Sequence, residues 1–312
     1  MKILFMGTPE FAVPCLDMLV TKGYSVVGVV TQPDKPKGRG HKVSPPPVKE
    51  YAIKKGIPVF QPERLRDGSF DNDLRLLSPD CIVVVAYGKI LPKSILDYPK
   101  YGCINVHASL LPKYRGAGPI QWAIINGEKE TGITTMYMDE GMDTGDMILK
   151  KKVMIGENET AGELHDRLSV LGAEVLADTL RRIQEGTAPR EPQNHSEATY
   201  APMLTKEVGC IDWNKSAVEI KNLVRGVNPW PVAYTNYEGK RFKVWSVDIG
   251  EKCDLGVPGM IIKYIDSQGL MVRTGDMGSI IIKEIQYEGG KKMSMEEYLR
   301  GHTIEIGKLL GS

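Results

Sequence analysis

Residues 25–31 read Ser-Val-Val-Gly-Val-Val-Thr, an apolar run that is rich in β-branched side chains. A continuous run of this kind, without polar alternation, is typical of a parallel strand that is buried on both faces. Comparable short apolar runs occur at residues 2–6, 81–86 and 103–107. The first half of the chain therefore contains at least four predicted strands of a buried sheet.

Helices are predicted between these strands, from about Glu10 to Lys22 and from Ser44 to about Lys55. Three prolines follow Ser44, and proline suits the first turn of a helix, where its missing N–H costs nothing. The alternation predicts an α/β domain of Rossmann type, with a mostly parallel sheet and helices on both faces. The loop Gly7-Thr8-Pro9-Glu10-Phe11 is not Gly-x-Gly-x-x-Gly, which argues against a nicotinamide cofactor.

In the second half of the chain, the regular alternation of strands and helices ends. Thr160 and Glu163 form a capping-box pattern, and a helix with leucines at helical spacing should run from there to about Gly186. A polar stretch follows, and beyond it a helix and five short strand-like runs predict a small β-barrel. The predicted strands lie at residues 233–237, 241–247, 259–265, 270–274 and 279–285. We therefore expect a catalytic domain at residues 1–188, a linker at 189–204 and a second domain at 205–312.

Composition sets limits on the class of protein. A chain of 312 residues is long for a single core, so two domains are expected. No segment reaches 18 consecutive apolar residues and no signal peptide precedes Gly7, so no membrane association is expected. The cysteines are five in number, without a Cys-x-x-Cys pair, which suits a reducing cytoplasm and predicts neither a zinc site nor a disulfide framework.

The strand at residues 103–107 reads Cys-Ile-Asn-Val-His. Side chains two apart on a strand point the same way, so Asn105 and His107 should project together at its end. An amide and an imidazole side by side can stabilise a carbonyl oxygen that becomes negative during acyl transfer. A polar strand end followed by a turn, or a histidine bonded within a core, are the alternatives. A Cys103–His107 nucleophilic pair is excluded, because four strand residues span about 13 Å.

An acidic partner for the histidine is expected downstream, in the segment that contains Asp143-Thr144-Gly145. Three other acids, Asp139, Glu140 and Asp146, lie in the same segment, and spacing alone cannot choose among them. A plain turn also explains an Asp-x-Gly sequence. A metal site is not expected from Asn105, His107 and an aspartate, because asparagine is a poor ligand for transition metals.

These motifs occur in an order that resembles the folate-dependent formyltransferases: Asn-x-His, then Ser-Leu-Leu-Pro-x-x-x-Gly, then Asp-x-Gly. The resemblance extends over the whole chain and includes residues 6–14, 31–34 and 228–231 (Asn-Pro-Trp-Pro). It implies an enzyme that moves a formyl group from 10-formyltetrahydrofolate to an amine, without a metal. It also implies that the second domain, residues 205–312, is an OB-like barrel.

The resemblance implies a role for particular residues. Asn105 would stabilise the oxyanion, His107 would act as a general acid, and Asp143, which matches the Asp-x-Gly position, would orient the imidazole and favour its cation. Two segments would line the folate site: the loop after the catalytic strand and the end of the preceding strand. The residues expected there are Tyr87, Ile90, Leu91, Ser109, Leu110, Leu111, Pro112 and Gly116.

The acceptor amine is predicted from a short basic loop at residues 34–42. The net charge of +1 gives no general attraction for nucleic acid, but Lys35, Lys37, Arg39 and Lys42 lie close together, with glycines on both sides of the arginine. Basic groups of this kind contact phosphates, although an ordinary solvated loop is the alternative. A barrel also suits RNA binding. Its candidate phosphate contacts are Lys206, Lys240, Arg241, Lys243, Lys291 and Lys292.

Together with the resemblance, these features imply that the acceptor is initiator methionyl-tRNA, formylated for translation initiation, and no protein partner is implied. An amino-sugar or other small-amine formyltransferase is the alternative within the same chemistry. A non-catalytic module that binds RNA or folate is the alternative from another class.

Overall fold

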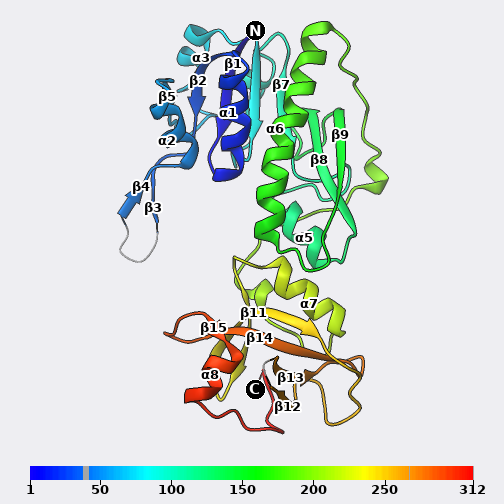
Figure 1. Ribbon diagram of the computed structural model, residues 1–312. Helices are drawn as coiled ribbons and strands as arrows, with labels where there is room; N and C mark the ends of the chain where they lie inside the picture. The colour runs from blue at the N-terminus through cyan, green and yellow to red at the C-terminus, as the bar shows by residue number, and fades with distance from the viewer. Residues whose placement is uncertain (38–41, 267, 312) are drawn as a thin grey trace. The chain divides into compact units, whose positions relative to one another are not determined.

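The computed structural model describes residues 1–37, 42–266 and 268–311 (Figure 1). The chain divides into two compact units whose segments interleave in sequence. The first unit comprises Met1–Pro119, Glu130–Met154 and His165–Pro202, and the second comprises Ile120–Lys129, Ile155–Leu164 and Met203–Ser312. The predicted boundaries at residues 188 and 205 stay a prediction.

The first unit is built on a seven-stranded sheet with the order β5-β2-β1-β6-β7-β8-β9 in the described part of the chain. The strands from β5 to β7 run parallel, and β8 and β9 are added antiparallel at one edge. The bounds are β1 Lys2–Gly7, β2 Ser25–Val30, β5 Val59–Phe60, β6 Cys81–Val85, β7 Cys103–His107, β8 Glu130–Tyr137 and β9 Met147–Met154. The four predicted buried strands are confirmed, whereas the antiparallel pair had no counterpart in the prediction.

Helices cover both faces of this sheet. On one face, a side chain at Gly172 of α6 (Ala161–Glu185) would lie 3.2 Å from Val106 Cγ1, so α6 packs directly on β7. On the other face, Cys103 Sγ lies 3.6 Å from the carbonyl oxygen of Ile95, in α4 (Lys93–Leu96). Figure 1 shows α6 beside α1 (Val13–Thr21), with β8 and β9 at the edge of the sheet. The predicted α/β class is confirmed.

Several local signals in the sequence fix where elements begin. The capping box before α6 is present, since the N–H of Thr160 donates to Glu163 Oε2 at 2.8 Å and the N–H of Glu163 donates to Thr160 Oγ1 at 3.3 Å. The remaining elements that precede residue 203 are short, and of these α5 lies mostly in the second unit. They are η1 Glu10–Ala12, β3 Lys35–Lys37, β4 Lys42–Ser44, α2 Pro47–Lys54, α3 Asp71–Leu77, α5 Pro119–Ile125 and η2 His195–Glu197.

The second unit contains a separate, all-antiparallel sheet with the order β10-β11-β14-β13-β12 and with β15 paired to β14. It confirms a strand-rich second domain. The bounds are η3 Glu207–Gly209, α7 Ala217–Gly226, β10 Ala233–Tyr237, β11 Lys240–Ile249, β12 Ile261–Ile265, β13 Gly269–Arg273, β14 Ser279–Tyr287, β15 Met293–Ser294 and α8 Met295–Gly301. Capping boxes at Ser216 and Ser294 begin α7 and α8. Helix α8 had no counterpart in the prediction.

Two segments that precede residue 165, Ile120–Lys129 and Ile155–Leu164, also belong to the second unit. Trp122 and Ile125 of α5 pack against its apolar cluster, and Arg225 of α7 donates to the carbonyl oxygens of Gly156 and Glu159 at 3.0 and 3.2 Å. In the described residues, no helix has both the length and the apolar character that crossing a membrane requires.

Candidate active site

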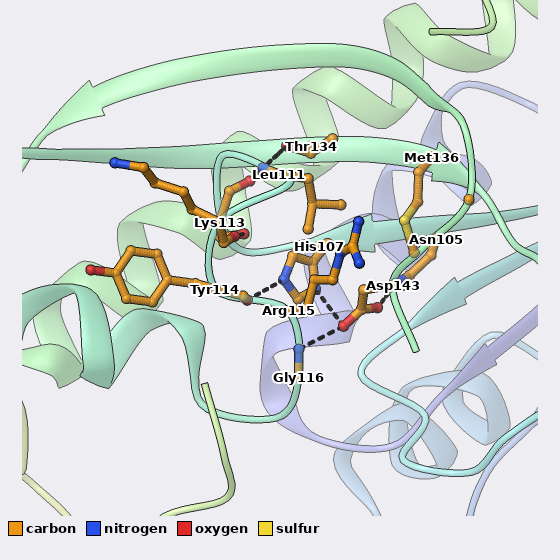
Figure 2. Close-up of polar contacts among 12 residues, drawn as sticks. Asn105, His107, Leu111, Lys113, Tyr114, Arg115, Gly116, Thr134, Met136 and Asp143 are labelled. Atoms are coloured by element: carbon orange, nitrogen blue, oxygen red, sulfur yellow. Dashed lines mark hydrogen bonds and ion pairs between the residues drawn. The ribbon is translucent and has the colours of Figure 1, made fainter. Parts of the chain in front are cut away.

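Strand β7 presents two polar side chains from one face at its carboxyl end. Asn105 is half-buried and His107 is buried, while Val106 between them points to the opposite face and α6. The strand is held on both sides, because Asn105 pairs with Val84 of β6 and with Met136 of β8. The local geometry expected from the alternation of a strand is thus the geometry that places the amide beside the imidazole (Figure 2).

The carboxylate of Asp143 meets both of these side chains. Its Oδ1 lies 3.3 Å from Asn105 Nδ2, and its Oδ2 lies 3.6 Å from His107 Nδ1. The main-chain N–H of Gly116 also donates to Oδ2, at 2.8 Å. Figure 2 shows the three side chains pointing toward one another from β7 and from the loop that carries Asp143. The structure therefore brings together the three residues for which the sequence predicted a shared role.

The competing acids are occupied elsewhere. Asp139 accepts hydrogen bonds within its own turn, from the Gly141 N–H at 3.0 Å and the Thr144 hydroxyl at 2.6 Å. Glu140 lies 3.5 Å from Lys93, and Asp146 lies 3.8 Å from Arg190. Within the described ranges, Asp143 supplies the carboxylate that lies within 4 Å of the His107 ring nitrogens.

The imidazole ring of His107 is oriented by a partner at each of its nitrogens. Its Nε2 lies 2.9 Å from the carbonyl oxygen of Tyr114, which can only accept, so Nε2 carries a proton. Its Nδ1 faces the carboxylate of Asp143, and a second proton there would point at a negative charge. Both ring nitrogens of His107 therefore face oxygen atoms. The Tyr114 carbonyl was missed from the sequence, because a main-chain partner leaves no signature in the side-chain pattern.

Gly116 occupies a position that requires glycine. Its φ is 116°, and a side chain there would lie 2.7 Å from the carbonyl oxygen of Ala201. The sequence assigned Gly116 to the folate site. The structure gives its N–H to Asp143 instead, so this glycine helps to hold the carboxylate, and its predicted contact with folate stays a prediction.

The loop from Ser109 to Pro112 is tied to β8. Thr134 donates to the Ser109 carbonyl at 2.7 Å and accepts from the Leu111 N–H at 3.2 Å. The side chains of Ser109 and Leu111 are buried, and the Ser109 hydroxyl donates to the Lys113 carbonyl at 2.7 Å. Leu110 and Pro112 are half-buried. Of these four predicted folate residues, Leu110 and Pro112 retain surface that a ligand can contact.

The other predicted folate residues follow β6, the strand next to β7. Tyr87 is 1% exposed and Leu91 is also buried, whereas Ile90 is 61% exposed. The Tyr87 hydroxyl is buried without a hydrogen-bond partner among the described atoms. Burial raises the pKa of Tyr87 to about 12, so the hydroxyl stays neutral and can donate. Tyr87 and Leu91 both belong to an apolar core cluster, so of these three predicted folate residues Ile90 is the one that presents surface to a ligand.

The basic loop forms an antiparallel hairpin of β3 and β4, in which Lys37 is paired with Lys42. Arg39 lies outside the described residues. Lys35 is exposed and donates to Gln32 Oε1 at 2.8 Å. At the base of the hairpin, Lys49 donates to both carboxylate oxygens of Asp34 at 2.8 Å, and this bond with one from Gln61 lowers the pKa of Asp34.

Thiol and metal chemistry find no support at this site. Burial raises the pKa of the Cys103 thiol, so it remains protonated, and its Sγ lies 3.6 and 3.9 Å from the carbonyl oxygens of Ile95 and Leu96 in α4. Over the part of the chain that the structure describes, no group of three or more His, Cys, Asp or Glu side chains is placed to hold a metal ion.

Comparison with known families is consistent with this site. The Formyl transferase family matches residues 1–180, and the Formyl transferase C-terminal domain matches residues 203–303. The chain therefore belongs to the formyl transferase family and is an enzyme of that class.

Particular relatives cover the entire chain. It is 57% identical over 312 residues to the methionyl-tRNA formyltransferase of Acetivibrio thermocellus and 60% identical over 311 residues to that of Alkaliphilus oremlandii, with 100% of both chains covered in each case. The same fold occurs in an N-formyltransferase from Helicobacter canadensis in complex with folinic acid and dTDP-3-aminofucose. That structure has a TM-score of 0.66 and 20% identity, covering 90% of this chain and 98% of its own.

A second solved structure is HypX from Aquifex aeolicus in complex with tetrahydrofolic acid. It has a TM-score of 0.63 and 17% identity, and the match covers 99% of this chain and 50% of that one. At these identities the two structures show a shared fold and nothing about the substrate of this chain.

Proposed function

We propose that this enzyme transfers the formyl group of 10-formyltetrahydrofolate to the α-amino group of initiator methionyl-tRNA. The observation that carries the proposal is the full-length identity of 57% and 60% to enzymes named methionyl-tRNA formyltransferase. The convergence of Asn105, His107 and Asp143 at the end of β7 supports the same chemistry, because it supplies the three groups that acyl transfer to an amine requires.

The donor is a folate. Two structures with the same fold hold folinic acid and tetrahydrofolic acid, and the loops that follow β6 and β7 supply the exposed side chain of Ile90 and the half-buried side chains of Leu110 and Pro112. A flat heterocycle needs apolar walls, and these side chains can supply them. Ligands of such sheets bind beyond the carboxyl ends of the strands.

The first step is attack of the neutral amine on the formyl carbon. The new C–N bond forms as the carbonyl π electrons move to oxygen, and the amine proton passes to the carboxylate of Asp143. Asn105 Nδ2 commits one hydrogen to Asp143 Oδ1 and has a second for the developing oxyanion. One such donor is worth about 10²–10³ in rate.

The second step breaks the bond between the carbon and N10 of the folate. The oxyanion reforms the carbonyl, and His107 delivers the proton from Nδ1 to the departing nitrogen, since Nε2 is held by the Tyr114 carbonyl. The proton taken up by Asp143 then restores the imidazolium across the 3.6 Å that separates the two groups. The products are the N-formyl amine and tetrahydrofolate.

The assignment of charged tRNA as the acceptor is supported by the hairpin that follows β2, because β2 runs parallel to β7 and both strands end at the edge of the sheet that carries the catalytic residues. The β3–β4 hairpin follows β2, and the exposed ammonium of Lys35 is one of its cationic groups. Lys37, Arg39 and Lys42 are assigned to phosphate contacts on the sequence alone. Phosphate contacts position a nucleic acid and make its binding dependent on salt.

One assay tests the function. The purified chain is incubated with 10-formyltetrahydrofolate and either methionyl initiator tRNA or a nucleotide-linked amino sugar, and the N-formyl product is measured. We expect turnover with the charged tRNA at least about 10³ times more efficient than with the sugar, a discrimination of about 4 kcal/mol. Preference for the sugar would support the alternative within the family, and no turnover with any amine would refute formyl transfer.

A further inference from the structure

Arg115 is the largest fully buried side chain among the described residues, at 2% exposed. A guanidinium cannot lose its proton in a protein, so its burial places a permanent positive charge in the interior. Among the described residues, the hydrogen bonds of its guanidinium go to Gln193 and His195 and not to a carboxylate. Burying a charge costs several kcal/mol unless its hydrogen bonds are satisfied, so the partners of Arg115 should explain why it is there.

Those partners are an amide oxygen and an imidazole nitrogen rather than a carboxylate. Nε and Nη2 of Arg115 both donate to Gln193 Oε1, at 3.1 and 2.7 Å, and Nη2 also lies 3.2 Å from His195 Nδ1. The main chain of Arg115 joins the same segment, because its N–H donates to the Thr199 carbonyl at 2.8 Å and its carbonyl accepts from the Ala201 N–H at 2.7 Å. The polar stretch that the sequence presented as a linker is thus docked beside the catalytic loop.

Gln193 also bonds to the loop that carries the carboxylate of Asp143. Its Nε2 donates to the main-chain carbonyls of Asp143 and Gly145, both at 2.8 Å. Carbonyls only accept and a guanidinium only donates, so a single orientation of the amide satisfies all four bonds. The buried cation fixes that orientation and polarises the amide toward the carbonyls.

The loop needs such a restraint. Asp143 has a φ of 55°, in the left-handed region that a residue with a side chain enters at a cost of about 1 kcal/mol. A side chain at Gly145 would collide with the carbonyl oxygen of Tyr137, so the loop also passes close to β8. Figure 2 shows Arg115 in the segment between Tyr114 and Gly116, which bond to His107 and Asp143.

We propose that Arg115 and Gln193 are positioning residues for catalysis. The pair holds the main chain of residues 143–145 so that the Asp143 carboxylate meets His107 and Asn105. This inference rests on the proposed formyl transfer, and it assigns Gln193, which lies 50 residues beyond Asp143 in sequence, a part in that reaction.

The decisive variant is Gln193→Glu. A glutamate keeps an acceptor for the guanidinium and adds an ion pair, but it turns a carboxylate oxygen toward the carbonyls of Asp143 and Gly145 where an N–H is needed. We expect an unfolding temperature no lower than that of the wild type. We expect kcat to fall about 10²-fold, because a displacement near 1 Å in an active site has that effect. The KM for both substrates should stay within about threefold.

A purely structural role predicts the opposite, namely a stable Gln193→Glu enzyme with wild-type kcat, and that result overturns the proposal. The pair Gln193→Met and Arg115→Met/Gln193→Met gives a second test. The single variant leaves the cation without its main acceptor and should lose stability, whereas the double variant removes the charge and should regain it. If the double variant also regains kcat, the positioning role is refuted.

Arg190→Gln is the matched control. This residue lies in the same segment, is exposed, and interacts with Tyr137 and Asp146 rather than with the Arg115–Gln193 pair. Its kcat should stay within about twofold of the wild type. Wild-type turnover in the same assay distinguishes failure of the proposed formyl transfer from failure of the positioning role. An inactive wild type refutes the proposed function together with this inference, whereas an active wild type with an unimpaired Gln193→Glu refutes the inference alone.

Discussion

Two segments that follow strands of the same sheet differ in how their polar groups are used. The loop of residues 109–116 follows β7, and its buried hydroxyl and amides bond to Lys113, Thr134, Thr199 and Asp143. The β3–β4 hairpin follows β2 and is fixed at its base by Asp34 and Lys49, while Lys35 donates to Gln32. The polar groups of the first segment are thus paired within the protein. The second segment instead presents the exposed ammonium of Lys35.

Replacement of Asp143 should test the organised loop most severely. Asp143→Ala removes the acceptor for the amine proton and the partner of His107, so kcat should fall about 10⁴-fold, the upper range for a positioned acid–base group. Single-turnover formylation with saturating substrates measures this directly. Glu140→Gln is the control, because that acid is exposed in the same segment and should be neutral. Full activity of Asp143→Ala would remove the carboxylate from the mechanism.

Asn105→Ala should have the next largest effect. The variant loses the N–H assigned to the oxyanion, so kcat should fall about 10²–10³-fold. Binding of a folate product should change little, because the interaction is made mainly in the transition state. The rate of formylation and the equilibrium binding of tetrahydrofolate, measured on the same variant, distinguish an effect on kcat from an effect on folate affinity. A loss of affinity without a loss of kcat would assign Asn105 to binding.

Charge removal in the hairpin should have a smaller effect and of a different kind. Lys35→Met with Lys37→Met should leave kcat unchanged and raise the KM for tRNA several-fold. The slope of log KM against log salt should fall by about one for each phosphate that the variant no longer neutralises. Lys54→Met, an exposed cation on α2, serves as the control. An unchanged slope would separate the hairpin from RNA binding.

The smallest effect is expected at the base of the hairpin. Hydrogen bonds from Lys49 and Gln61 lower the pKa of Asp34 below its ordinary value of 3.8, so ionised Asp34 stabilises the folded state. That contribution is present above the ordinary pKa and is lost as pH falls through the lower, folded pKa. Asp34→Asn should therefore be less stable than the wild type at neutral pH. In urea titrations the difference in free energy of unfolding between the two proteins should shrink below about pH 4. A difference that is independent of pH would show that the charge of Asp34 does not stabilise the fold.

The sequence predicts what depends on local repetition. Strands buried on both faces appear as apolar runs, the capping box at Thr160 begins α6, and alternation along β7 places Asn105 beside His107. These features are determined by neighbours within a few residues. The family motif then selected Asp143 from four nearby acids, which spacing alone could not do.

The rest depends on partners that are remote in sequence or belong to the main chain. The Tyr114 carbonyl on His107 has no side-chain signature, and the bonds between Arg115 and Gln193 join residues 78 apart. Polar residues at 187–199 resemble a linker in composition, yet Gln193 is buried by the loops it bonds. Composition reports how polar a segment is, and it cannot report whether each polar group has found a buried partner.

The interleaving of the two units has a consequence for dissection and recombination of the enzyme. Residues 120–129 and 155–164 belong with the second unit, where Trp122 and Ile125 complete an apolar core. A fragment that stops at residue 188 would carry these stretches without the core they fill and would expose them to solvent. Swapping the second unit between relatives accordingly means transplanting three pieces of chain rather than a single tail.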